Sequence, residues 1–288
     1  MNSTEKLFTA VKLFLEDSPN SKKLYEVLDV WEFEVYNVIF QNVVQEDDVS
    51  TFLCMESTGL AMTIRHEIDG LRNIQFLRAF YNMYTEMNSA LDQFNQISEI
   101  IETSTALTIS IYLVLGPEID FGVSFHQPLS SKQLSGYLNT CPEQDAVERW
   151  LYENNNPIAT AISFSFMKTW QEMTFYIFDE ERDANFKRAF SLFDCLGIPL
   201  TKELISKLKL SKADENNCRF SYTDDMVETI SLEMRKVEPK HALEIGDCLD
   251  TDFNRRKWID FQRTLEGEKL ITFSLTKDGY LMYQTVHF

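Results

Sequence analysis

One glutamate and two arginines are the residues whose types and positions could do chemistry in a pocket. Glu172 lies in a stretch of alternating polar and apolar residues. In a dry, aromatic pocket the pKa of such a carboxyl rises, and the group can take a proton from an indole or a phenol. At a strand end it would instead reach solvent. Arg65 and Arg219 could bind an anion, or they could pair structurally with Glu233 or Asp120.

The cysteines and histidines do not form the pattern of a metal site or a disulfide framework. The five cysteines are scattered, no CxxC pair occurs, and the four histidines show no ligand spacing. We therefore expect reduced thiols that fill the core of a cytoplasmic protein. His126 and His287 follow alternating stretches, so we expect a rim position or an ordinary hydrogen bond for them rather than catalysis.

The length and charge of the chain restrict its class. The 288 residues predict one domain, 1–288, and 27 Lys and Arg against 45 Asp and Glu give a net charge of -18. Such a surface repels phosphate backbones and anionic lipids, so we expect no nucleic-acid or membrane partner, and it favours a monomer. The first residues lack the basic start and continuous apolar region of a secretory signal, and no apolar stretch is long enough for a transmembrane helix.

A period-two alternation of apolar and polar residues recurs along the chain. In 105–126, two alternating runs are joined by a turn at Gly116-Pro117. Similar pairs of runs have their turns near residues 58, 168, 225 and 278. The pattern predicts five β-hairpins, and thus ten strands. Helical periodicity predicts helices over Thr4–Asp17, Asn20–Gln45, Asp69–Glu102 and Ala184–Leu196. A further helix is predicted to end at Leu208 with Thr201 as its N-cap, whereas Glu238–Glu268 has no clear period.

The polar face of these strands distinguishes an open sheet from a closed barrel. It carries serine, threonine and tyrosine rather than the lysine and glutamate of a face exposed to water. We therefore predict an α+β fold, a ten-stranded antiparallel β-barrel of five α-β-β-α units with helices outside and a ligand lumen inside. Ten strands leave a centre that side chains do not fill. The alternative is a two-layer α+β sheet with one wetted face.

This repeated unit resembles the soluble aromatic prenyltransferases of the ABBA type, most closely their small bacterial branch. The most specific stretch is 162–200, a strand pair followed by a helix and a Leu-Gly-hydrophobic-Pro turn, ISFSFMKTWQEMTFYIFDEERDANFKRAFSLFDCLGIPL. The final hairpin, ITFSLTKDGYLMYQTVHF, is also similar to the family's. The resemblance implies a transferase of secondary metabolism that moves a dimethylallyl or geranyl group from its diphosphate to an electron-rich aromatic of indole or phenol type.

The resemblance also implies roles for residues predicted to face the lumen. Arg65, Arg219, Tyr176 and Tyr283 would bind the diphosphate, and tyrosine rings, including that of Tyr112, would shield the allylic cation. Glu172 would orient the acceptor and take its proton. The pocket would further be lined by Ser163, Ser165, Thr174, Ser231, Glu233 and Thr285.

The chain departs from the family at most of its basic lumen positions. The positions at or near which the family has Lys or Arg are occupied here by Asp120, Trp170, Thr229 and Leu281. The position of the magnesium-binding Asp that some members carry is occupied by Ala61. One interpretation is that Mg²⁺, with Asp120 as ligand, replaces the lost charge. Another is that the barrel no longer binds diphosphate and acts as a cyclase, an isomerase or a binding protein for a small neutral or cationic ligand.

A third alternative is an interaction module with a packed α+β core. The three hypotheses differ in the lumen. Prenyl transfer requires net positive charge at one barrel mouth, the second hypothesis predicts an acidic or neutral mouth, and the third predicts no cavity.

Overall fold

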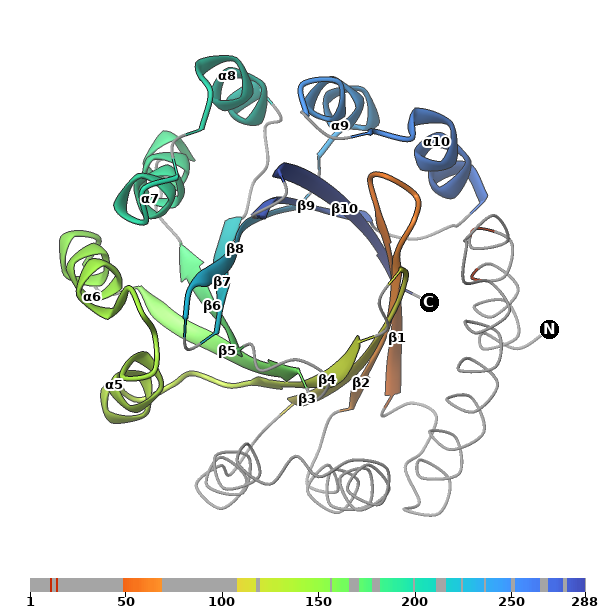
Figure 1. Cartoon of the computed structure of the whole chain (residues 1–288). Helices are drawn as coiled ribbons and strands as arrows, with labels where there is room; N and C mark the ends of the chain where they lie inside the picture. The colour runs from red at the N-terminus through yellow and green to blue at the C-terminus, as the bar shows by residue number, and fades with distance from the viewer. Residues whose placement is uncertain are drawn as a thin grey trace, which may run out of the picture.

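The computed structural model describes residues 11, 14, 49–68, 108–117, 120–155, 157–165, 171–177, 182–198, 200–210, 216–223, 225–235, 237–249, 252–264, 269–276 and 279–287. Ten strands form one closed antiparallel barrel in the order β1-β10-β9-β8-β7-β6-β5-β4-β3-β2 (Figure 1). The strands are β1 (Val49–Glu56), β2 (Met62–Ile68), β3 (Thr108–Leu115), β4 (Asp120–His126), β5 (Ile158–Ser165), β6 (Gln171–Ile177), β7 (Asn216–Tyr222), β8 (Val227–Arg235), β9 (Lys269–Thr276) and β10 (Gly279–His287). The predicted ten-stranded barrel is confirmed, and the open two-layer sheet is wrong.

The barrel is built from hairpins of neighbouring strands and is closed by β1 and β10, where Cys54 stands opposite Thr285. Because neighbouring strands run antiparallel around the barrel, the end of the first strand and the start of the second strand of every hairpin lie at the same end of the barrel, which we call the turn end. The strands connect to the outer segments at the opposite end, which we call the helix end. This arrangement gives the lumen two different mouths.

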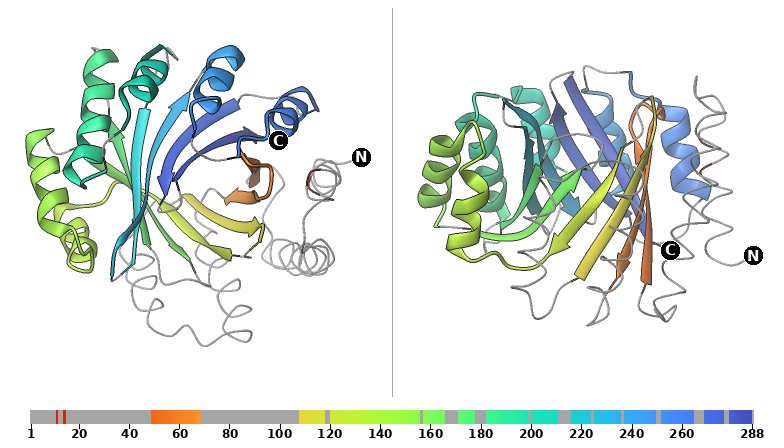
Figure 2. Two further views of the ribbon diagram at one scale, coloured as in Figure 1. Left: turned by 45° about the horizontal axis from the view of Figure 1, so that its top comes forward. Right: turned by 60° about the horizontal axis from the view of Figure 1, so that its bottom comes forward.

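Six described helices surround this barrel on the outside, as Figures 1 and 2 show. They are α5 (Ser131–Leu138), α6 (Gln144–Glu153), α7 (Arg182–Cys195), α8 (Lys202–Leu210), α9 (Pro239–Gly246) and α10 (Arg255–Thr264). Helix α7 and the N-cap of α8 match the prediction, since Thr201 Oγ1 accepts a hydrogen bond from the Leu204 N–H at 3.3 Å. Helices α5, α6, α9 and α10 were not predicted. None of the helices described is long and apolar enough to cross a membrane.

Three predicted helices, Thr4–Asp17, Asn20–Gln45 and Asp69–Glu102, lie outside the described residues, apart from Val11 and Phe14. The side chains of Val11 and Phe14 belong to the buried core.

The apolar face of the strands packs against the helices, as the alternation predicts. Phe175 on β6 illustrates this packing: its ring lies edge-on to Trp150 of α6, with centroids 5.5 Å apart, and stacks on Phe220 of β7 at 5.9 Å. The indole N–H of Trp150 donates to the backbone oxygen of Arg188 and to Ser191 Oγ on α7. All three rings are buried, so the apolar material lies between barrel and helices and the polar strand face is left for the lumen.

Candidate active site

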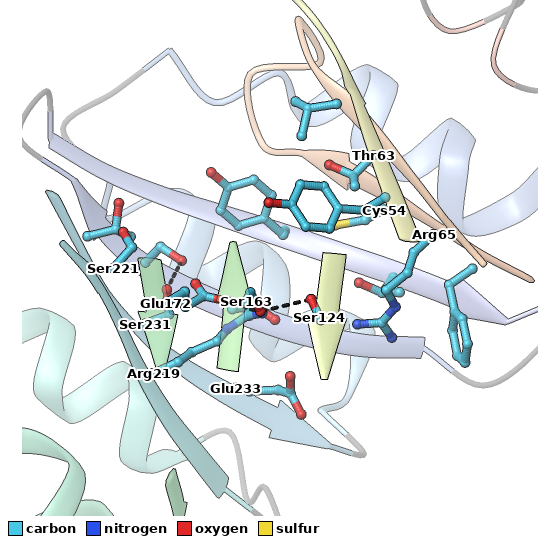
Figure 3. A pocket seen from close by; sticks show the side chains of 18 of the residues that line it. Cys54, Thr63, Arg65, Ser124, Ser163, Glu172, Arg219, Ser221, Ser231 and Glu233 are labelled. Carbon is cyan, nitrogen blue, oxygen red and sulfur yellow. Dashed lines mark hydrogen bonds and ion pairs between the residues drawn. The ribbon is translucent and has the colours of Figure 1, made fainter. Parts of the chain in front are cut away.

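The lumen holds a cavity that opens toward both ends of the barrel. A turn-side chamber of about 740 Å³ is lined by residues such as Thr63, Tyr112 and Ser274 (Figure 3). A helix-side chamber of about 480 Å³ includes His126 and Arg235. The two chambers share a central wall that contains Arg65, Glu172 and Arg219, so they are connected. A cavity of this size accommodates small organic ligands, and the packed-core alternative without a cavity is therefore wrong.

Arg219 on β7 forms an ion pair in the lumen. Its Nη1 lies 3.6 Å from Glu172 Oε1 on β6. Burial alone lowers the pKa of the Arg219 guanidinium, but the charges of Glu172 and Glu233 outweigh it and hold the pKa above its ordinary value. Arg219 is thus a permanent cation, and its partner is Glu172 rather than the Glu233 or Asp120 considered from the sequence.

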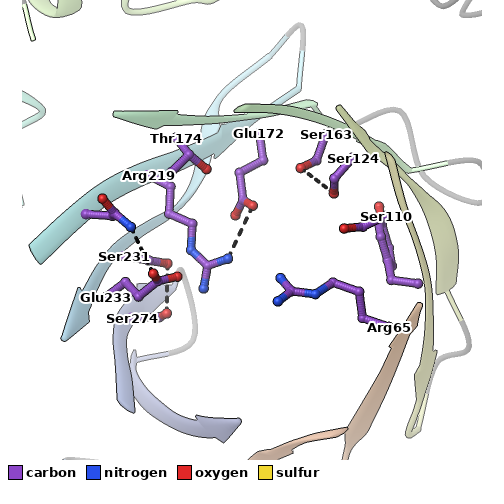
Figure 4. Close-up of polar contacts among 12 residues, drawn as sticks. Arg65, Ser110, Ser124, Ser163, Glu172, Thr174, Arg219, Ser231, Glu233 and Ser274 are labelled. Atoms are coloured by element: carbon purple, nitrogen blue, oxygen red, sulfur yellow. Dashed lines mark hydrogen bonds and ion pairs between the residues drawn. The ribbon is translucent and has the colours of Figure 1, made fainter. Parts of the chain in front are cut away.

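Arg65 on β2 approaches the same space from the opposite wall (Figure 4). Its guanidinium carbon lies 4.5 Å from the ring centroid of Phe52, and its Nη2 lies 3.9 Å from Glu67 Oε1. The Nε atoms of both arginines are buried and have no hydrogen-bond partner within the described part of the chain. Donors in this state are suited to an anionic ligand or to ordered water.

Two tyrosines add aromatic surface to the turn-side chamber. The Tyr112 hydroxyl donates to the backbone oxygen of Phe164 at 3.0 Å. Burial raises the pKa of Tyr112, and the negative charges of Asp120 and Glu172 raise it further. Burial, followed by the charge of Glu56, likewise raises the pKa of Tyr283. Both phenols therefore stay neutral at physiological pH and offer π faces rather than negative charge to a ligand.

The cavity wall includes hydrogen-bonded hydroxyl pairs on opposite sides. Ser124 Oγ donates to Ser163 Oγ at 2.8 Å between β4 and β5, and Ser231 and Ser274 form an equivalent 2.8 Å pair between β8 and β9 (Figure 4). On the acidic side, Glu233 Oε1 accepts from the side-chain amide of Asn217 at 2.9 Å. These contacts hold the polar wall in place without involving the two arginines.

The structure places most predicted site residues on the cavity wall. The charged and aromatic ones that line it are Arg65, Arg219, Glu172, Glu233, Tyr112 and Tyr283, and the hydroxyl-bearing ones are Ser163, Thr174, Ser231 and Thr285. Tyr176 lies near the helix end with 40% of its surface exposed and outside either set of lining residues. Ser165 and Asp120 are buried beside the lumen, where Ser165 Oγ donates to Asp120 Oδ1 at 2.6 Å.

Several residues that line the cavity were not predicted from the sequence, among them Phe52, Cys54 and Glu67. The alternation of β1 places Cys54 opposite in face to Leu53 and Met55, so strand parity could have identified it. Its expected role as core filler is wrong, since Cys54 lines the cavity. Burial raises the pKa of the Cys54 thiol, and its hydrogen bond to Thr285 lowers it only in part.

The described residues show no group of three His, Cys, Asp or Glu side chains that could hold a metal ion. Asp120, the predicted magnesium ligand, is instead engaged by Ser165. The donor set in this part of the chain does not fit a resident divalent cation.

No family model and no curated protein matches the sequence. Among solved structures, 5-dimethylallyltryptophan synthase from Streptomyces coelicolor is similar at a TM-score of 0.61 and 11% identity, covering 88% of this chain and 90% of that one. The 6-dimethylallyltryptophan synthase from Micromonospora olivasterospora, in complex with DMASPP and Trp, is similar at a TM-score of 0.51 and 10% identity. The match covers 85% of this chain and 83% of that one. At these identities the likeness shows the fold, and the chain folds as the ten-stranded barrel of the ABBA prenyltransferases.

Proposed function

We propose that the protein is an aromatic prenyltransferase, which transfers a dimethylallyl or geranyl group from its diphosphate to an electron-rich aromatic of indole or phenol type. The observation that carries the proposal is the pair of guanidinium groups, Arg65 and Arg219, on opposite walls of one cavity with buried, unpartnered Nε donors. The likeness in fold to enzymes named for dimethylallyl transfer to tryptophan supports it.

The two arginines would bind the diphosphate oxygens and stabilise the negative charge that grows as the allylic C–O bond breaks. Tyr112 and Tyr283, held neutral by burial, would face the allylic cation with their rings. The aromatic carbon of the acceptor then attacks the cation, and a C–C bond forms. Glu172 lies in the central wall beside Arg219 and would take the proton that leaves this carbon.

Magnesium has no place in this scheme. Because Asp120 is engaged by Ser165 and no ligand cluster occurs in the described residues, we derive no step through a metal ion.

The balance of charge favours a second candidate. Among described residues the cavity is lined by four glutamates, Glu67, Glu172, Glu228 and Glu233, and by three arginines, Arg65, Arg219 and Arg235. Among the described residues, the lining of neither chamber has more arginines than glutamates. A barrel with this lining could instead bind a neutral or cationic small molecule, as a cyclase, an isomerase or a binding protein.

Calorimetry with dimethylallyl and geranyl thiolodiphosphate, with and without Mg²⁺, separates the two candidates. We expect binding without added metal, and about ten- to a hundredfold weaker binding for Arg65→Gln and for Arg219→Gln, since a charge-assisted hydrogen bond contributes about 1.5–3 kcal/mol. Arg256→Gln is the matched control, because that side chain is 93% exposed on α10. Absence of heat in both conditions would eliminate prenyl transfer in favour of the second candidate.

A further inference from the structure

A row of polar side chains crosses four strand pairings of the lumen wall. Glu67 on β2 stands opposite Ser110 on β3, and Ser110 stands opposite Ser124 on β4. Ser124 stands opposite Ser163 on β5, which in turn stands opposite Glu172 on β6. Figure 4 shows Glu172, Ser163, Ser124 and Ser110 following one another along this wall. We call these five residues the polar row.

The polar row leads from the central wall of the lumen to one mouth. Glu172 is the second residue of β6, a strand that begins at the turn end. Glu67 is the last residue but one of β2, a strand that ends at the helix end. Because the strands of a barrel are tilted, residues that stand opposite one another describe a slanted line, and here that line reaches the helix end.

Hydrogen bonds already connect parts of the polar row. Ser124 Oγ donates to Ser163 Oγ at 2.8 Å, and Ser110 Oγ donates to Glu67 Oε1 at 3.2 Å. His126, two residues beyond Ser124 on β4, joins the outer end with Nε2 2.7 Å from Ser110 Oγ and 3.5 Å from Glu67 Oε1. The Ser110 hydroxyl lies within donating distance of both Glu67 Oε1 and His126 Nε2, and donation to Nε2 is the direction that passes a proton to the imidazole.

The two remaining steps, Ser163 to Glu172 and Ser110 to Ser124, join residues that stand opposite each other on the same face. Side chains in this relation have Cβ atoms about 4.5–5.5 Å apart, a separation that one rotating hydroxyl or one bridging water spans. At each of these two steps, proton transfer requires a rotated hydroxyl or one bridging water between the facing side chains.

Burial decreases from the serines of the polar row to His126, as a path that delivers a proton to solvent requires. Ser110, Ser124 and Ser163 are all buried, whereas the side chain of His126 is 31% exposed. The charged residues that line the helix-side chamber with His126 are Arg65, Glu67, Glu172, Arg219, Glu233 and Arg235. Of these, Glu67 is in direct contact with the imidazole, since its Oε1 lies 3.5 Å from Nε2 of His126.

We propose that the polar row and His126 carry the reaction proton from Glu172 to solvent, an inference that rests on the proposed prenyl transfer. The C–C bond forms as the C–O bond to diphosphate breaks, and the aromatic carbon then gives its proton to the Glu172 carboxylate. Before transfer, the three serine hydroxyls rotate so that Ser163 donates to Ser124, Ser124 to Ser110, and Ser110 to the unprotonated Nε2 of His126. Each serine then accepts one proton from its inner neighbour and gives one to its outer neighbour, His126 becomes imidazolium, and the imidazolium releases the proton to bulk water. Glu172 is thereby a carboxylate again, and no oxidant or further reactant is needed.

The polar row is needed only while the donor and the acceptor fill the lumen. Donor and acceptor together displace water from the central wall, so that Glu172 has no direct contact with bulk water until the product leaves. The residues of the polar row between Glu172 and the mouth act through Glu172, so they position and reset it rather than touching the reacting carbon.

Rapid-quench kinetics with dimethylallyl diphosphate and an aromatic acceptor test this. In Ser163→Ala and His126→Ala the first turnover should keep its rate, because Glu172 is still present, while the later turnovers slow about tenfold. Added imidazole should restore the steady-state rate of His126→Ala but not that of Ser163→Ala. Ser274→Ala is the matched control, because it breaks an equivalent 2.8 Å hydroxyl pair on the other wall. The ratio of its first-turnover rate to its steady-state rate should equal that of the unmodified protein.

The outcomes separate the polar row from the proposed function. Product formation by the unmodified protein, with the same ratio of first to later turnovers in all three variants, would overturn the proton route alone. A loss of the first turnover in Ser163→Ala equal to the loss of later ones would assign Ser163 a structural role and would also overturn it. Absence of product with the unmodified protein would overturn the prenyl transfer, and the route with it.

Discussion

Replacing Gly122 by alanine tests whether the barrel wall fixes the position of the Tyr112 ring. Gly122 on β4 stands opposite Tyr112 on β3. A Cβ at this position would collide with the phenol oxygen of Tyr112 and the backbone oxygen of Phe164, and would lie 2.7 Å from Tyr112 Cζ. The backbone of β5 at Phe164 must then shift, and the Tyr112 ring must leave its place and lose its 3.0 Å hydrogen bond to Phe164.

The magnitude follows from two losses. A neutral hydrogen bond contributes about 1 kcal/mol, and overpacking a dense site costs about 1–3 kcal/mol. We therefore expect Gly122→Ala to lower the free energy of unfolding, measured by urea denaturation, by about 2–4 kcal/mol. Tyr112→Phe removes the hydrogen bond without the collision and should lose only about 1 kcal/mol. The displaced ring should also weaken binding of dimethylallyl thiolodiphosphate in calorimetry.

Gly136 provides the matched control for this substitution. It lies in α5, and an added Cβ there meets nothing within 4 Å. Gly136→Ala should therefore raise the free energy of unfolding by about 0.5–1 kcal/mol through helix propensity. If Gly122→Ala were as stable as the unmodified protein and bound the donor equally well, the space above Gly122 would not determine where Tyr112 lies.

Two further predictions concern single titratable groups. Glu172→Gln should reduce kcat about 100-fold without weakening donor binding, measured by product formation and calorimetry, because it removes the base and leaves both arginines in place. An unchanged kcat would remove Glu172 from the mechanism. His66 on the outer face of β2 is buried, and burial lowers its pKa to about 4. His66 takes up a proton more readily in the unfolded chain than in the folded protein. Its contribution to the free energy of unfolding is therefore complete above pH about 6.5 and decreases by about 3 kcal/mol as the pH falls to about 4. Between pH about 6.5 and pH about 4, the free energy of unfolding of His66→Leu should fall by about 3 kcal/mol less than that of the unmodified protein, measured by urea denaturation at both pH values. An equal fall in the two proteins would contradict the buried neutral imidazole.

The strands could be predicted because alternation encodes a physical division of the barrel wall. Residues such as Ile109, Phe164 and Met173 must face the helices, while Ser163 and Glu172 face the lumen, so a period of two follows directly from burial. The closed barrel followed from a second property, the scarcity of charge on the polar face. Both signals are averages over many residues, which makes them robust to single exceptions.

The short helices were harder to predict because their signals are local. Helix α5 begins with a capping box, in which Ser130 Oγ accepts from the Gln133 N–H and the Gln133 side chain accepts from the Ser130 N–H. The spacing of Ser130 and Gln133 in the sequence is the one that this motif requires, so α5 could have been found. Helix α9 has Pro239 at its start, but Glu238 makes no side-chain cap, and its eight residues contain little periodicity.

The pairing of charges in the lumen could not be read from strand parity. Parity assigns Arg219 and Glu172 to the same face, but it assigns Glu233 and Asp120 to that face as well. Which acid meets Arg219 depends on the register between β6 and β7, where Glu172 stands opposite Ser221 and diagonal to Arg219. A shift of two residues would keep every side chain on its face and yet exchange the partners. The sequence therefore contains the composition of the site, while its electrostatics arise only when the barrel closes in one register.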